Sequence, residues 1–136
     1  MNPWKYKGKV FRSEQIEDNE GFVYCITNLL TNRRYIGRKY FWELRKAPGS
    51  KRRTRKESNW QKYHGSCLPL LNDVQKYGPE NFRREILGLY KHRPLVNYFE
   101  IKEQFIREVL ETDEYYNENI NGKWHWVKAH TDKLEK

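Results

Sequence analysis

The chain has 136 residues, of which 33% are charged and 37% hydrophobic, and its mean hydropathy is −1.11. We expect one domain with a small core. No apolar run approaches the roughly 18 residues of a membrane span, and the N-terminus shows no apolar signal segment. The two cysteines, Cys25 and Cys67, form neither a disulfide framework nor a metal-ligand spacing. A membrane-spanning protein is excluded, and a reducing, cytoplasmic setting is predicted.

The net charge of +9 is concentrated in one part of the chain. Residues 21–60 hold eleven Lys or Arg against two acids, whereas residues 101–120 hold two basic residues against six acidic ones. A concentrated basic segment is typical of a protein that binds a phosphate backbone; the alternative is a solvated, charged loop. The nucleic-acid-binding candidates are Arg38, Lys39, Lys51, Arg52, Arg53, Arg55, Lys56 and His64.

The N-terminal quarter predicts a β-hairpin. Residues 4–11 read as an added edge strand or an arm, so residues 1–20 are treated as an N-terminal arm. Residues 22–27 and 34–36 are rich in β-branched and aromatic types and flank a polar loop, which favours a hairpin. Antiparallel pairing would bring Tyr24 and Tyr35 side by side. Gly37 is expected to end the second strand, where its missing side chain allows close backbone approach.

Two basic stretches follow the hairpin. In residues 38–46, Phe41, Leu44 and Arg45 fall at i, i+3 and i+4, which predicts a short helix that ends at residues 47–50. Residues 51–56 hold no apolar side chain to bury, and they predict a mobile loop that could become ordered on a polyanion.

The second half predicts a helix, a strand and a longer helix. Apolar spacing favours a helix at residues 70–77, between Pro69 and the Gly78-Pro79 stop. Residues 82–90 read as a third strand, and residues 98–111 as a helix with Asn97 as its N-cap. We therefore predict an α+β fold with a three-stranded, mainly antiparallel sheet flanked by helices. The domain is placed at residues 21–122, with a tail at 123–136.

Five features of this order together resemble the GIY-YIG endonuclease superfamily. Phe22-Val23-Tyr24 stands where the family has Gly-Ile-Tyr, and Tyr35-Ile36-Gly37 matches its second half. Arg45 lies eight residues past Gly37, where the family has an invariant arginine, and a helix glutamate and a later asparagine complete the set. Further motifs at residues 60–66, 77–82 and 98–105 are similar to small phage-encoded members. The one departure is Phe22 in place of the first glycine, which Gly21 precedes.

The resemblance implies a DNA endonuclease that uses a divalent cation, Mg²⁺ or Mn²⁺. By position, Tyr24 would receive or relay the proton of the attacking water, and Tyr35 would orient beside it. Arg45 would clamp the phosphate. The metal carboxylate is Glu100 or Glu103, with Glu100 preferred, and the bracing asparagine is Asn117, with Asn119 and Asn121 as alternatives. Both tyrosine hydroxyls should then face a pocket shared with Arg45 and one of the two glutamates.

Each of these residues also has an ordinary structural interpretation, because a hairpin tyrosine most often packs in a core or across strands. The alternatives to an enzyme are a basic nucleic-acid-binding module without the chemistry, and a phage structural protein that contacts DNA. The segment after the asparagine leaves no room for a separate recognition domain, so we expect low sequence specificity. Double-strand cutting would need a homodimer or sequential nicking.

Overall fold

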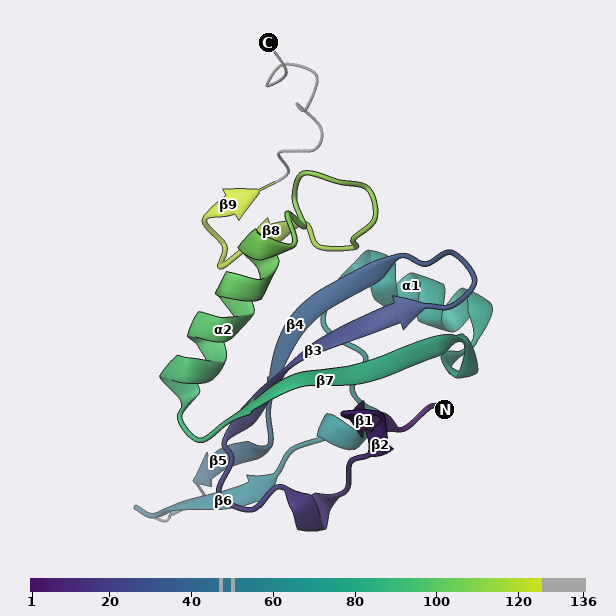
Figure 1. Cartoon of the computed structure of the whole chain (residues 1–136). Helices are drawn as coiled ribbons and strands as arrows, with labels where there is room; N and C mark the ends of the chain where they lie inside the picture. The colour runs from purple at the N-terminus through teal and green to yellow at the C-terminus, as the bar shows by residue number, and fades with distance from the viewer. Residues whose placement is uncertain (47, 50, 126–136) are drawn as a thin grey trace.

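The computed structural model describes residues 1–46, 48–49 and 51–125 (Figure 1). Within these residues no helix is long and apolar enough to cross a membrane. In chain order the strands and helices are β1 (Trp4–Tyr6), β2 (Lys9–Val10), η1 (Ser13–Gln15), β3 (Gly21–Asn28), β4 (Arg34–Tyr40), β5 (Trp42–Lys46), β6 (Arg53–Glu57), η2 (Trp60–Lys62), α1 (Leu68–Tyr77), η3 (Pro79–Asn81), β7 (Phe82–Tyr90), α2 (Arg93–Ile106), β8 (Asn119–Ile120) and β9 (Trp124–His125).

The central sheet has five strands in the order β2-β1-β7-β3-β4. The predicted hairpin and third strand form its centre, since β3 pairs antiparallel with both β4 and β7. The α+β class is confirmed, but the central sheet has five strands rather than the predicted three. Of the two predictions for residues 4–11, the added edge strand is confirmed and the arm is not: β1 pairs with β7 in parallel and with β2 antiparallel, which makes the sheet mixed. Pairing of β1 with a strand some 80 residues away leaves no local signal in the sequence.

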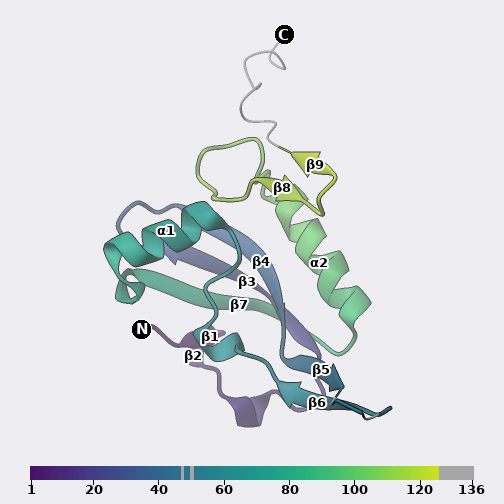
Figure 2. The ribbon, with the colours of Figure 1, turned by 180° about the vertical axis from the view of Figure 1, so that it is seen from behind.

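Strand β3 divides the core into two layers because its side chains alternate between the faces of the sheet. Phe22, Tyr24 and Ile26 pack with α1 and the N-terminal aromatic residues on one face. Val23 and Cys25 pack with α2 and the segment that follows it on the other. Figures 1 and 2 show the two helices covering opposite faces. Every residue of β3 is buried, as expected for a central strand covered on both faces.

The predictions for residues 38–46 and 51–56 are wrong. Residues 38–40 continue β4, and β5 then pairs antiparallel with β6 from Trp42 opposite Glu57 to Lys46 opposite Arg53. The β5–β6 ribbon, as we call residues 42–46 and 53–57, is a separate two-stranded sheet at one end of the domain (Figure 1). The helical spacing was misleading because Phe41 is buried in the core, whereas Leu44 is exposed.

Of the two predicted helices, α1 is confirmed and α2 is displaced. Helix α1 ends at Gly78, which has a φ of 94°. Helix α2 begins five residues earlier than predicted, and Pro94 lies in its first turn. Proline is tolerated there because the backbone N–H groups of the first turn have no acceptor within the helix, so the missing N–H costs no hydrogen bond. It ends at Ile106 rather than at residue 111. Glu108 takes the left-handed conformation there (φ 53°), and the Val109 amide donates to the Gln104 carbonyl.

Candidate active site at the edge of β4

A cavity of about 980 Å³ lies along β4, the edge strand of the central sheet. Because β4 is an edge strand, side chains from both of its faces can reach the same space. Tyr35 and Lys39 contribute from one face and Arg38 from the other. Helix α2 adds Glu100 and Gln104, and residues 63–68 and 117–122 close the remaining sides. The cavity therefore gathers residues from segments that are far apart in the sequence.

Tyr24 and Tyr35 lie side by side in this cavity, as predicted, with ring centroids 6.1 Å apart. The β3–β4 register places Tyr24 opposite Gly37 and Tyr35 opposite Ile26, so the two tyrosines are diagonal neighbours on one face. Gly37 lies within β4 rather than at its end, and a Cβ there would overlap the Tyr24 hydroxyl and the Tyr35 ring. The glycine of the second motif thus provides the space for the two rings.

Both phenols are held in the protonated form. Burial raises the pKa of Tyr24 well above its usual value, and the neighbouring Tyr35, Tyr63 and Glu100 raise it further. Burial also raises the pKa of Tyr35, with Cys67 and Glu100 adding to the effect. At neutral pH neither residue is a preformed phenolate base, so each can act as a hydrogen-bond donor or as a proton relay.

The two candidate glutamates have different surroundings. Glu100 lines the cavity, is almost fully buried, and accepts a 2.7 Å hydrogen bond from Nη1 of Arg38. Burial raises the pKa of Glu100, and the bond to Arg38 opposes that rise. Glu103 does not line the cavity, and its carboxylate pairs with Arg107 at 2.8 Å, one turn further along α2. The geometry thus favours Glu100 as the carboxylate of the site.

Asn117 joins the C-terminal segment to the edge of β4. Its side chain accepts a hydrogen bond from the Ile36 amide at 3.1 Å and donates one to the Ile36 carbonyl at 2.9 Å. Gln104 donates to the same carbonyl at 3.0 Å. Ile36 directly follows Tyr35 in β4, so these side-chain amides fix the strand at the point where the cavity opens. Asn119 and Asn121 also line the cavity but are exposed.

The donor set at Glu100 fits a magnesium ion. Mg²⁺ keeps several waters and is usually held by one or two carboxylates together with substrate phosphates. Among the described residues no cluster of three or more His, Cys, Asp or Glu side chains could enclose a metal, so a site here would rest on Glu100 and water. One turn along α2, the buried Oε1 of Gln104 has no hydrogen-bond partner, which leaves an acceptor for a bound water beside the carboxylate.

Comparison with protein families identifies the domain. A family model described as "Putative endonuclease segE, GIY-YIG domain" matches residues 4–120, most of the chain. The chain belongs to this GIY-YIG family. No curated protein and no solved structure was found to match it. The match begins at β1, in agreement with the inclusion of the N-terminal strands in the sheet.

Arg45, which the resemblance predicts to be the family's arginine, lies in β5, opposite Thr54, and not on the predicted helix. Its side chain and that of Arg53 lie outside the described residues. The described cations that line the cavity are Arg38, Lys39 and Arg93. Lys39 stands over the ring of Tyr63, 4.2 Å from its centroid, and burial lowers the pKa of its ammonium.

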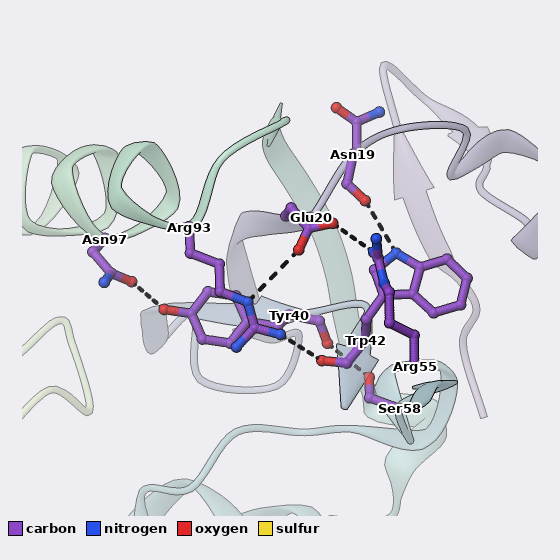
Figure 3. A network of polar contacts seen from close by, with 8 residues as sticks. All are labelled: Asn19, Glu20, Tyr40, Trp42, Arg55, Ser58, Arg93 and Asn97. Atoms are coloured by element: carbon purple, nitrogen blue, oxygen red, sulfur yellow. Dashed lines mark hydrogen bonds and ion pairs between the residues drawn. The ribbon is translucent and has the colours of Figure 1, made fainter. Parts of the chain in front are cut away.

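The remaining basic candidates differ in their surroundings. Lys51, Arg52 and Lys56 are exposed on the β5–β6 ribbon and its connecting turn. Arg55 is also on the ribbon, but it forms an ion pair with Glu20 and lies over the ring of Trp42 (Figure 3). His64 is buried against the Lys62 carbonyl, and burial and the nearby Arg84 lower its pKa, so it is neutral at pH 7. Arg55 thus has a structural role at the base of the ribbon.

Several residues of the site were not predicted from the sequence. Tyr63 packs edge-on against Tyr24 with ring centroids 6.2 Å apart, and it lines the cavity. Gln104 lies one helical turn after Glu100, a spacing of i, i+4 that a search for partners of the glutamate could have found. Arg93 could not have been found in this way, because it precedes the helix expected at residues 98–111.

Proposed function

We propose that this GIY-YIG domain is a DNA endonuclease that hydrolyses phosphodiester bonds with the help of a divalent cation. The observation that carries the proposal is the meeting of Tyr24, Tyr35, Glu100 and Asn117 around one cavity. The resemblance assigns these four residues to the family's motif positions, and they come from β3, β4, α2 and the C-terminal segment. A purely structural set of tyrosines would have no reason to share an open, polar cavity with a buried carboxylate.

Glu100 would hold the cation, Mg²⁺ or Mn²⁺. When bound, such an ion neutralises charge on the phosphoryl oxygens and stabilises the departing oxygen. The protein supplies the proton path. Because the Tyr24 phenol is protonated, its oxygen can accept a proton from the attacking water only as its own proton passes to a neighbour. The rings of Tyr63 and Tyr35 pack against the Tyr24 ring, so we assign these phenols to a relay. Each passes on its own proton as it accepts one, and the last proton goes to solvent water in the open cavity.

The phosphate would be bound by the cations that surround the cavity. Arg38 presents a guanidinium at the carboxylate that would hold the metal, and its side chain is 39% exposed, so it can turn toward a phosphate. Lys39 lies on the opposite face of β4, on the side of the tyrosines. Arg45 belongs to this group on the family motif alone. Together they would place positive charge on both sides of a bound phosphodiester.

A second candidate function is a DNA-binding module without nuclease activity. The observation that favours it is the ion pair between Arg38 and Glu100, because a carboxylate that is already neutralised is a weaker ligand for a cation.

We further propose a phage origin and a cytoplasmic site of action in the host cell. This proposal rests on the similarity of the motifs at residues 60–66, 77–82 and 98–105 to phage-encoded members. A homodimer would explain double-strand cutting by a domain with one site.

A supercoiled plasmid assay tests the proposal. The wild-type protein is incubated with plasmid DNA in Mg²⁺, in Mn²⁺ and in EDTA, and nicked and linear products are separated on a gel. We expect nicked circles first, with either cation and not in EDTA. Binding to the plasmid without nicking in any cation would favour the DNA-binding module.

A further inference from the structure

The β5–β6 ribbon and its connecting turn carry a high density of like charge. Residues 45–56 hold seven Lys or Arg and no acid. The register sets Lys46 and Arg53, two residues of like charge, at facing positions of the two strands. Isolated two-stranded ribbons are at best marginally stable in water. A ribbon of this composition therefore needs either strong anchors or a polyanionic partner.

A set of anchors lies at the base of the ribbon. Glu20 pairs with Arg55 and, at 3.7 Å, with Arg93 of α2, whose Nη2 donates to the Trp42 carbonyl at 2.8 Å. At the end of β6, Glu57 accepts hydrogen bonds from Ser13 at 2.9 Å and from Trp60 at 3.1 Å. Figure 3 shows how Glu20 lies between the two arginines beside Trp42.

Beyond these anchors, the described lysines are open to solvent. Lys46 and Lys56 are exposed on the ribbon and Lys51 in its connecting turn, and the ribbon extends away from the central sheet in both views (Figures 1 and 2). Leu44, the aliphatic side chain of β5, is also exposed. The ribbon is thus fixed firmly at its base and presents cations to solvent beyond it.

The ribbon also borders the candidate active site. Trp42, Glu43 and Leu44 of β5 line the same cavity as Tyr24 and Glu100. A polyanion that contacts the ribbon can therefore continue into the cavity without crossing another part of the domain. This continuity distinguishes the ribbon from a basic surface placed at random.

We propose that the β5–β6 ribbon enters the major groove of double-stranded DNA and holds the duplex so that one strand's backbone passes over the cavity. The inference rests on the proposed function for its choice of DNA as the partner. The dimensions are compatible: the major groove is about 12 Å wide and admits a two-stranded β-ribbon, and five strand residues extend about 17 Å. The minor groove, at about 6 Å, is too narrow for the ribbon.

The first test measures binding of a short duplex in EDTA by fluorescence anisotropy, at several salt concentrations. The ribbon variant Lys46→Gln, Lys51→Gln, Lys56→Gln is compared with a control that removes the same charge at exposed positions away from the cavity, Lys5→Gln, Lys7→Gln, Lys9→Gln. The ribbon variant should bind the duplex at least tenfold more weakly than the wild type at about 50 mM salt. Its plot of log association constant against log salt concentration should also have a shallower slope, by about 0.9 for each phosphate that the ribbon no longer neutralises. The control should retain the wild-type affinity and slope.

The second test identifies the groove by methylation with dimethyl sulfate, which modifies guanine N7 in the major groove and adenine N3 in the minor groove. Wild-type protein should protect N7 and leave N3 reactive, and the ribbon variant should lose the N7 protection at concentrations that still saturate the duplex. Circular dichroism spectra verify that both variants are folded.

Three results would overturn the proposal: no duplex binding by the wild-type protein, equal weakening in both variants, or protection of N3 in place of N7. Because these measurements are made in EDTA, they are independent of nuclease activity. A protein that protects N7 but never nicks DNA would retain the ribbon proposal and contradict the proposed function. A protein that nicks DNA without protecting N7 would retain the proposed function and contradict the ribbon proposal.

Discussion

Arg38 and Glu100 form an ion pair of 2.7 Å that connects β4 to α2 across the candidate active site. The carboxylate is 11% exposed and the guanidinium 39% exposed, so the arginine is the partner that can leave. Each of the two groups has a proposed task in the reaction, Glu100 for a cation and Arg38 for a phosphate. In the structure each satisfies the other, so the approach of a cation and of DNA should separate them.

Arg38→Ala should therefore strengthen cation binding while it weakens catalysis. An ion pair with one solvent-exposed partner contributes up to about 1 kcal/mol, which predicts roughly fivefold tighter Mn²⁺ binding by the variant. Isothermal titration calorimetry without DNA measures the affinity, and plasmid nicking should decrease at the same time. Arg34→Ala, on the same strand but paired with Glu114, is the control and should change neither. Unchanged or weaker Mn²⁺ binding by Arg38→Ala would contradict the competition.

Gly37→Ala should displace the two motif tyrosines. The new methyl group would overlap the Tyr24 hydroxyl and the Tyr35 ring, and the Tyr24 ring is fully buried, so it cannot move aside freely. Overpacking of this kind costs about 1–3 kcal/mol, which urea denaturation measures, and nicking should fall more than binding. Gly88→Ala is the matched control in β7, because its methyl group would meet only the end of the partly exposed Tyr90 side chain. Equal losses in the two variants would show that Gly37 has no special relation to the site.

Tyr24→Phe should change the stability of the protein at alkaline pH. The pKa of Tyr24 is raised by burial, so above about pH 10 the unfolded chain releases this proton while the folded protein keeps it. The unfolded state then binds fewer protons, and the free energy of unfolding falls as pH rises past about 10. The phenylalanine variant lacks this contribution and should show a shallower fall between about pH 9 and 11 in urea denaturation. An identical slope in both proteins would indicate that Tyr24 ionises normally.

Asn117→Ala should destabilise the edge of β4. It removes two hydrogen bonds to Ile36 and leaves the Ile36 amide without its side-chain acceptor, at a cost of about 1–3 kcal/mol. Asn119→Ala is the control, because Asn119 is exposed and its side chain bonds locally to the Gly122 amide; its effect should lie within about 0.5 kcal/mol. Thermal unfolding of the two variants measures the difference. A larger effect at Asn119 would reassign the bracing asparagine.

The elements predicted correctly from the sequence are those with a strong local pattern. Residues 22–27, 34–36 and 82–90 are rich in β-branched and aromatic types, and α1 has a proline in its first turn and a glycine-proline stop at its end. The β5–β6 ribbon could not be predicted in this way because it has almost no apolar pattern. Its anchors, Glu20 and Arg93, lie in other parts of the chain.

The ends of α2 were misplaced for related reasons. Pro94 precedes the expected start of the helix at residue 98, although proline suits the first turn of a helix. After Ile106 the chain leaves the helix through a left-handed Glu108, where no glycine marks the position. For the site, the motif pattern names Tyr24, Tyr35, Glu100 and Asn117 as its first candidates. These four residues line the cavity, as do the alternatives Asn119 and Asn121, whereas Glu103 does not. The pairing of Arg38 with Glu100 depends on the packing of α2 against β4, which the order of residues does not reveal.

The most direct test of the proposed function is plasmid nicking in Mg²⁺ by Glu100→Gln compared with Glu103→Gln. The two glutamates lie one turn apart on α2, and the substitutions remove the same charge, but only Glu100 lines the cavity. We predict that Glu100→Gln binds DNA and fails to nick it, whereas Glu103→Gln nicks at close to the wild-type rate. Wild-type nicking by Glu100→Gln would contradict the assignment of this carboxylate and of the site built around it.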